Sequence, residues 1–134
     1  MYEENAKNQD SQTAALQIAQ ILKDGKGENV VVIDVSKISS WTDFFVIATV
    51  KSRAHWQGLE RQIKDYIKEN GMRVHHANHK IQGGDDWNLI DADSVVVHLM
   101  SQDARDFYEL EKLWHAGIVI NEATDSSKQN TTNI

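Results

Sequence analysis

The stretch that decides the fold is "FFVIATV" at residues 44–50, in which threonine is the only polar residue. Its aromatic and β-branched residues favour a strand, and apolar and polar positions do not alternate along it. A strand that is apolar on both of its faces is covered on both sides of its sheet. We therefore predict a central strand here, with further strands and helices arranged around it.

Four other segments predict the remaining strands of this sheet. "VVVIDV" at 30–35 and "VVVHLM" at 95–100 are short and rich in β-branched residues, as buried strands are. "WNLID" at 87–91 alternates in polarity, and the tight turn "DADS" joins it to 95–100, which predicts a β-hairpin. "MRVHHANHKI" at 72–81 is more polar and predicts a strand nearer an edge.

Three segments carry apolar residues at the helical spacing of three and four. The first starts at Ser11 and stops at Gly25, and the second runs from Ser52, a predicted N-cap, to Gly71. The third is predicted to start at a capping Asp103. The apolar positions of the three helices are Ala15, Ile18, Ala19, Leu22, Leu59, Ile63, Ile67, Phe107, Leu110 and Trp114.

The order of these elements predicts an α/β protein with a mixed β-sheet of about five strands and helices packed on it. A chain of 134 residues is expected to form one domain and to bury about two-thirds of its unfolded surface. We assign 1–11 to a flexible N-terminus, 12–118 to the single domain, and 119–134 to a polar, disordered tail.

The composition restricts the class of protein. The chain has no cysteine, which excludes disulfides, thiolate metal sites and a cysteine nucleophile. The first residues, "MYEENAKNQD", have no apolar core of the kind that a signal peptide needs. No apolar run approaches the roughly 20 residues that span a bilayer. We therefore expect a soluble, cytoplasmic protein that makes no membrane contact.

The formal net charge of −6 bears on the partner. An acidic protein is repelled by phosphate backbones, so we expect no direct sequence-specific binding to nucleic acid. The same charge suits a basic partner, and ribosomal proteins are typical basic partners. The alternative is that the charge only maintains solubility.

One hypothesis for the stretch around 91 is a metal-dependent nucleotidyl or phosphoryl transferase. Asp91 and Asp93 have the Asp-x-Asp spacing that can share Mg²⁺. However, the chain has no phosphate-binding loop, and no basic residue lies between Ile81 and His98 to neutralise a triphosphate. The other interpretation is a hairpin turn, in which aspartate caps local N–H groups.

The histidines do not predict a metal site. His75 and His76 face opposite sides of a strand, and His79 joins His75 only if the strand continues through it. His98, in an apolar strand, is interpreted as a core residue hydrogen-bonded to a neighbour. A general base is the alternative, but no nucleophile is paired with it in the sequence. We expect no cofactor, no metal and no catalytic residue.

A protein-docking surface has more support. Trp87, Leu89 and Asp91 point to one face of their strand, which places an apolar centre beside an acidic rim. The last helix adds three partner-binding candidates at successive spacings of three, which are Arg105, Tyr108 and Glu111. The alternative is that Trp87 lies beneath a helix as a core residue.

Three motifs in order resemble the ribosomal silencing factor family, also called RsfS or Iojap. They are "VIDVSKISSWTDFFVIATVKSRAH", "WNLIDADSVVVHLM" and "ARDFYELEKLW". The resemblance implies a translation repressor that binds the large ribosomal subunit through its L-fourteen-type ribosomal protein and blocks joining of the small subunit. It also implies a nucleotidyltransferase-like topology without the catalytic set. A purely homodimeric scaffold is a third hypothesis, which is compatible with the repressor function in the free state.

Site residues are carried over from the resemblance by their motif positions. Trp87 matches the family's strand tryptophan at the ribosomal-protein contact. Asp91, Arg105, Tyr108, Glu111 and Trp114 match other motif positions, whereas Phe107 and Leu110 are expected in the core. Asp43, Ser52 and His55 match positions expected to maintain the fold.

The sequence departs from the family pattern at a few positions. Val50 replaces the usual glycine after the second strand. Trp41 and Trp56 are additions, and we expect one of them to widen a contact or a homodimer surface.

Overall fold

The computed structural model describes residues 2–40, 42–73, 75–80, 87–92, 94–109, 112 and 118–120, of which 2–9, 75–80 and 118 are described by their backbone. The strands are β1 (Glu28–Asp34), β2 (Phe44–Thr49), β3 (His75–Lys80), β4 (Trp87–Ala92), β5 (Val95–Met100) and β6 (Ile118–Val119). The helices are α1 (Tyr2–Asp24), α2 (Arg53–Glu69) and α3 (Gln102–Tyr108).

The strands form one sheet in the order β3-β4-β5-β2-β1-β6. β2 lies inside this sheet and all six of its residues are buried, which confirms the predicted central strand. It runs parallel to β5 and antiparallel to β1, so the sheet is mixed. β3 lies at one edge, as its polar sequence predicted.

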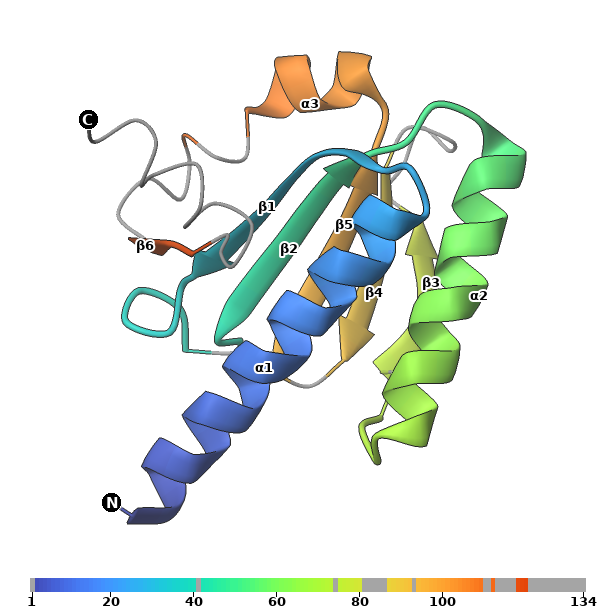
Figure 1. Ribbon diagram of the computed structural model, residues 1–134. Helices are drawn as coiled ribbons and strands as arrows, with labels where there is room; N and C mark the ends of the chain where they lie inside the picture. The colour runs from blue at the N-terminus through green and yellow to red at the C-terminus, as the bar shows by residue number, and fades with distance from the viewer. Residues whose placement is uncertain are drawn as a thin grey trace, which may run out of the picture.

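The two faces of the sheet are covered differently. α1 and α2 lie side by side over one face, whereas α3 follows β5 and crosses one end of the strands (Figure 1). The helix-covered face holds the larger core cluster, which includes Phe44, Val46, Leu59, Ile63 and Val97. The opposite face carries a second buried cluster, to which α3 contributes Ala104. We call this opposite face, which bears Trp87, Leu89, His98, Ile47 and Phe45, the Trp87 face.

The second helix confirms its predicted start and end. Ser52 Oγ accepts a hydrogen bond from the His55 N–H at 3.2 Å, which caps α2. Gly71 lies just beyond the helix with a φ of +75°, a conformation that glycine adopts without a steric penalty. The His55 ring also hydrogen-bonds to the Gly25 carbonyl and so ties α2 to the end of α1. Ser52 and His55 therefore have the fold-maintaining contacts that were expected.

The first helix begins earlier than predicted. α1 starts at Tyr2 rather than at Ser11. The segment "YEENAKNQD" contains no glycine or proline, and Glu, Ala, Lys and Gln favour helix. The prediction followed the apolar stripe, which begins only where the helix reaches the sheet.

The last helix differs from its prediction at both ends. Its N-cap is Ser101, whose Oγ accepts from the Ala104 N–H at 3.0 Å, and Asp103 lies in its first turn instead. α3 ends at Tyr108 because Glu109 adopts a left-handed conformation with a φ of 48°. Phe107 was expected in the core, but 78% of its surface is exposed, so that prediction is wrong. Leu110 and Trp114 lie outside the described residues.

The sheet has one more strand than the approximate number predicted. β6 pairs with β1 through Ile33–Val119 and Asp34–Ile118. Two residues are too few to show a polarity pattern. The predicted tail starts at 119, the second residue of this strand, and the domain limits stay a prediction.

Trp56 is a core residue rather than part of a contact surface. It is 5% exposed, and its indole Nε1–H donates to the Val50 carbonyl at 3.2 Å. The structure therefore excludes Trp56 as the added tryptophan that widens a contact or dimer surface, because its side of α2 faces the sheet. Trp41 lies outside the described residues. Two departures from the family pattern, Val50 and Trp56, thus contact each other.

None of the helices in the described part of the chain is both long enough and apolar enough to cross a membrane.

The packing of α2 on the sheet is tested by Ile63→Ala. Ile63 is completely buried, so its truncation is expected to lower the free energy of unfolding by about 3 kcal/mol. The matched control is Gln62→Ala on the exposed side of the same helix, for which we expect almost no change. Denaturant unfolding followed by circular dichroism measures both. Equal stability of the two variants would contradict the assigned packing.

Candidate functional site

The site is built on the hairpin of β4 and β5. The register pairs Trp87 with Met100, Leu89 with His98, and Ala92 with Val95, which leaves positions 93 and 94 for the turn. The predicted hairpin is confirmed. Burial alternates along β4, and Trp87 and Leu89 are half-buried on the Trp87 face. Their shared orientation is therefore confirmed as well.

Trp87 is held from two sides. Its indole Nε1–H donates to His98 Nδ1 at 3.0 Å, and the centres of the two rings are 5.9 Å apart. On the other side its ring packs on Tyr108 of α3, with ring centres 4.7 Å apart at an angle of 53°. The tryptophan is thus neither a free surface residue nor a fully buried core residue. It packs against the second core cluster and keeps part of its surface accessible.

An aromatic row extends from Trp87 to the outside of α3. Tyr108 contacts Phe107 edge-to-face, with ring centres 4.9 Å apart. The exposed fraction rises to 42% for Tyr108 and 78% for Phe107. We call Trp87, Tyr108 and Phe107 the aromatic row. Sequence analysis missed Phe107 because its spacing to 110 and 114 resembles a core stripe, which holds only if the helix continues beyond Tyr108.

Arg105 is turned inward, unlike the exposed position expected of a partner contact. It is 7% exposed, and its Nη1 donates to the Thr49 hydroxyl at 3.0 Å. Thr49 ends β2 and is itself buried. The guanidinium therefore ties α3 to the end of the central strand.

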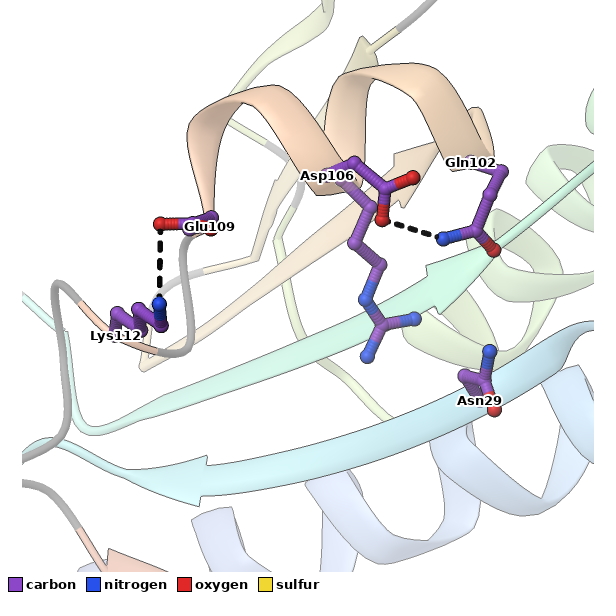
Figure 2. Close-up of a pocket in the computed structure, with 6 residues that line it drawn as sticks. Asn29, Gln102, Asp106, Glu109 and Lys112 are labelled. Carbon is purple, nitrogen blue, oxygen red and sulfur yellow. Dashed lines mark hydrogen bonds and ion pairs between the residues drawn. The ribbon is translucent and has the colours of Figure 1, made fainter.

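A pocket of about 500 Å³ lies on the side of α3 that faces β1 (Figure 2). Two polar interactions join residues that line this pocket. Gln102 Nε2 donates to Asp106 Oδ1 at 2.8 Å, and Lys112 forms an ion pair with Glu109 at 3.6 Å. The lining includes two cations and two carboxylates, so charge alone selects neither an anion nor a cation. The residues that line it are Asn29, Gln102, Arg105, Asp106, Glu109 and Lys112.

The remaining predicted site residues are placed only in part. Asp91 is half-buried on β4, opposite Val96. Asp93 and Glu111 lie outside the described residues. In the part of the chain that is described, no three residues of the His, Asp and Glu types gather as metal ligands do.

His98 is a buried, neutral residue of the Trp87 face. It is 4% exposed, and Phe45 packs edge-to-face on it with ring centres 4.7 Å apart. Burial lowers the pKa of His98 to about 3, because the charged imidazolium is poorly solvated there. Since Nδ1 accepts the bond from Trp87, the ring proton is on Nε2. The interpretation of His98 as a core residue bonded to a neighbour is confirmed.

The fold and this site define an α/β protein in which a row of aromatic side chains on β4 and α3 becomes progressively more exposed. A family model described as "Ribosomal silencing factor during starvation" matches residues 8–133. The chain is similar to the ribosomal silencing factor RsfS of Treponema pallidum, with 38% identity over 106 residues that cover 79% of this chain and 94% of that protein. This chain belongs to the ribosomal silencing factor family.

Two further relatives extend the comparison. The chain is 33% identical over 99 residues to the mouse protein named mitochondrial assembly of ribosomal large subunit protein 1, covering 72% of this chain and 43% of that protein. A crystal structure of a Chromobacterium violaceum protein superposes with a TM-score of 0.70 at 30% identity, covering 78% of this chain and 86% of that one. The solved structure agrees with the mixed α/β fold described above.

The buried neutral His98 predicts a specific pH dependence of stability. Its pKa is about 3 in the folded protein and near the ordinary 6.5 when unfolded, so between these values the unfolded chain binds more protons. Stability contributed by the neutral ring is therefore present above pH 6.5 and falls as the pH is lowered. The expected slope reaches about 1.4 kcal/mol per pH unit.

Denaturant unfolding at several pH values measures this slope. His98→Leu is expected to lower this slope by the contribution of about one proton, whereas Gln62→Ala, on the exposed side of α2, serves as the control that keeps it. The same slope in wild type and His98→Leu would show that His98 is not the titrating group.

Proposed function

We propose that this protein is a translation repressor that binds the large ribosomal subunit through its L-fourteen-type ribosomal protein and sterically blocks joining of the small subunit. Among the structural observations, the aromatic row is the one that carries this proposal. Membership of the ribosomal silencing factor family supports it, and one relative is named for assembly of the large ribosomal subunit.

The aromatic row has the properties of an interface centre. Tryptophan and tyrosine are enriched among the residues that dominate binding energy, since they bury a large area at a small cost in conformational entropy. Trp87 is already fixed by His98 and Tyr108, so little freedom remains to be lost on binding. Phe107, which is 78% exposed, has the most apolar surface to gain from a partner.

Charge around the aromatic row favours a basic partner. Asp103 and Asp106 are exposed on α3, whereas Glu109 at its end is paired with Lys112. The whole chain carries a formal net charge of −6. Complementary charge steers association and rejects like-charged competitors. A basic ribosomal protein fits this pattern better than exposed RNA does, because the phosphate backbone would be repelled.

The proposed action requires no chemical step. A protein bound where two subunits meet prevents their contact by excluded volume alone. The residues that this proposal assigns to binding are Trp87, Leu89, Asp91, Tyr108 and Phe107, with Arg105 assigned to holding α3 in place. Glu111 remains a predicted contact on the basis of its motif position.

Truncation of the tryptophan tests the anchor. Trp87→Ala is expected to weaken binding to isolated large subunits by about 2 kcal/mol, or roughly 30-fold, because the centre of the aromatic row is removed. Co-sedimentation over a range of subunit concentrations measures the change. Ile38→Ala is the matched control, because Ile38 is 43% exposed and lies in the loop after β1, away from the aromatic row.

The anchor role requires that Trp87→Ala remains folded by circular dichroism and that Ile38→Ala binds as the wild type does. A folded Trp87→Ala variant with undiminished binding would remove Trp87 from the interface.

Electrostatic steering by the acidic chain is expected to make the association rate depend on salt. Raising the salt concentration from 50 to 200 mM is expected to slow association with the large subunit by roughly ten-fold, because screening removes the electrostatic steering. The dissociation rate is expected to change less. Stopped-flow measurements with a labelled protein separate the two rates. An association rate that does not depend on salt would show that charge does not steer binding.

A further inference from the structure

We infer that His98 is a positioning residue for the docking site, which sets the orientation of the Trp87 ring without touching the partner. The expected effect of His98 on partner binding rests on the function proposed above. The expected effect of His98 on the Trp87 ring does not rest on that function and can be measured in the free protein.

The geometry places His98 where it can control Trp87. Within the hairpin, His98 pairs with Leu89, so it is the diagonal neighbour of Trp87 on the same face. The indole has a single donor, and that donor is directed at His98 Nδ1 at 3.0 Å. Rotating the indole about its side-chain bonds would break this bond. The hydrogen bond therefore selects the ring orientation that packs on Tyr108.

His98 cannot act by direct contact. Only 4% of its surface is exposed, and Phe45 packs on its ring from the sheet. Trp87 and Tyr108 separate it from the exposed end of the aromatic row. Any influence on a partner must therefore pass through Trp87.

Histidine is an unfavourable choice here for stability alone. The other residues of β5 are Val, Leu and Met, and all six positions are buried. The second ring nitrogen, Nε2, has no hydrogen-bond partner among the described residues. Burying an unsatisfied polar group costs free energy that an aliphatic side chain would not lose. A residue that breaks the pattern of its strand at such a cost is expected to serve a site.

If His98 only filled the core, loss of its hydrogen-bond acceptor would not affect Trp87. Two substitutions distinguish this alternative from the positioning role. His98→Leu removes the acceptor and the unsatisfied nitrogen together. His98→Asn keeps an acceptor, since the Asn Oδ1 can occupy the place of Nδ1. Trp87→Phe removes the donor from the other end at a half-buried position, where folding is not at risk.

The first readout is the Trp87 indole N–H in the free protein, followed by nuclear magnetic resonance and assigned by its loss in Trp87→Phe. His98→Leu is expected to speed exchange of this proton with water by about ten-fold or more, and His98→Asn much less. The denaturation midpoint of His98→Leu at neutral pH is expected to equal or exceed that of the wild type. Unchanged indole exchange in His98→Leu would overturn the inference.

The second readout is co-sedimentation with large subunits. His98→Leu and Trp87→Phe are each expected to weaken binding by about ten-fold, and the double variant no further, because both remove one interaction. Wild-type binding by His98→Leu, despite faster indole exchange, would overturn the positioning role.

The failure of the proposed function has a different signature. If Trp87→Ala binds large subunits normally, the docking site is wrong, whereas faster indole exchange in His98→Leu would still support the link between His98 and Trp87.

Discussion

The structure depends on the burial of β2 and β5 on both of their faces. These parallel neighbours have all of their residues buried, and they separate the core beneath α1 and α2 from the second cluster on the Trp87 face. A slip of one residue would move every side chain of one strand into the opposite core cluster, so close packing on both faces opposes it. The hairpin, the position of α3 and the inward Arg105–Thr49 bond all follow from this fixed pair.

The proposed docking site lies where complete burial ends. β4 is the next strand outward from β5, and its residues on the Trp87 face are only half-buried. A tryptophan at that boundary can pack on the core with one side and keep another accessible. The short α3 then supplies Phe107 and Tyr108, which are its last two residues before the left-handed Glu109. The strand β4 and the last turn of α3 together form the aromatic row.

Much of this arrangement follows from the sequence. The apolar run at 44–50 predicted the central strand, and the alternation in "WNLID" predicted that Trp87 and Leu89 share a face. Local patterns could not predict that Phe107 is exposed, because this depends on where α3 ends. They could not predict that Arg105 is buried, because this depends on its hydrogen bond to Thr49. The hydrogen bond between Trp87 and His98 could not be predicted either, because it joins diagonal positions of two strands whose register is fixed only in the folded hairpin.

A fixed tryptophan, an exposed aromatic row and an acidic net charge together support the proposed steric function. The most direct measurement is the rate and extent of subunit joining, followed by light scattering, when isolated large subunits are first incubated with the protein. The account predicts that joining falls in proportion to the large subunits occupied, and that small subunits added in excess do not restore it quickly. Normal joining by large subunits that demonstrably carry the bound protein would contradict the central claim.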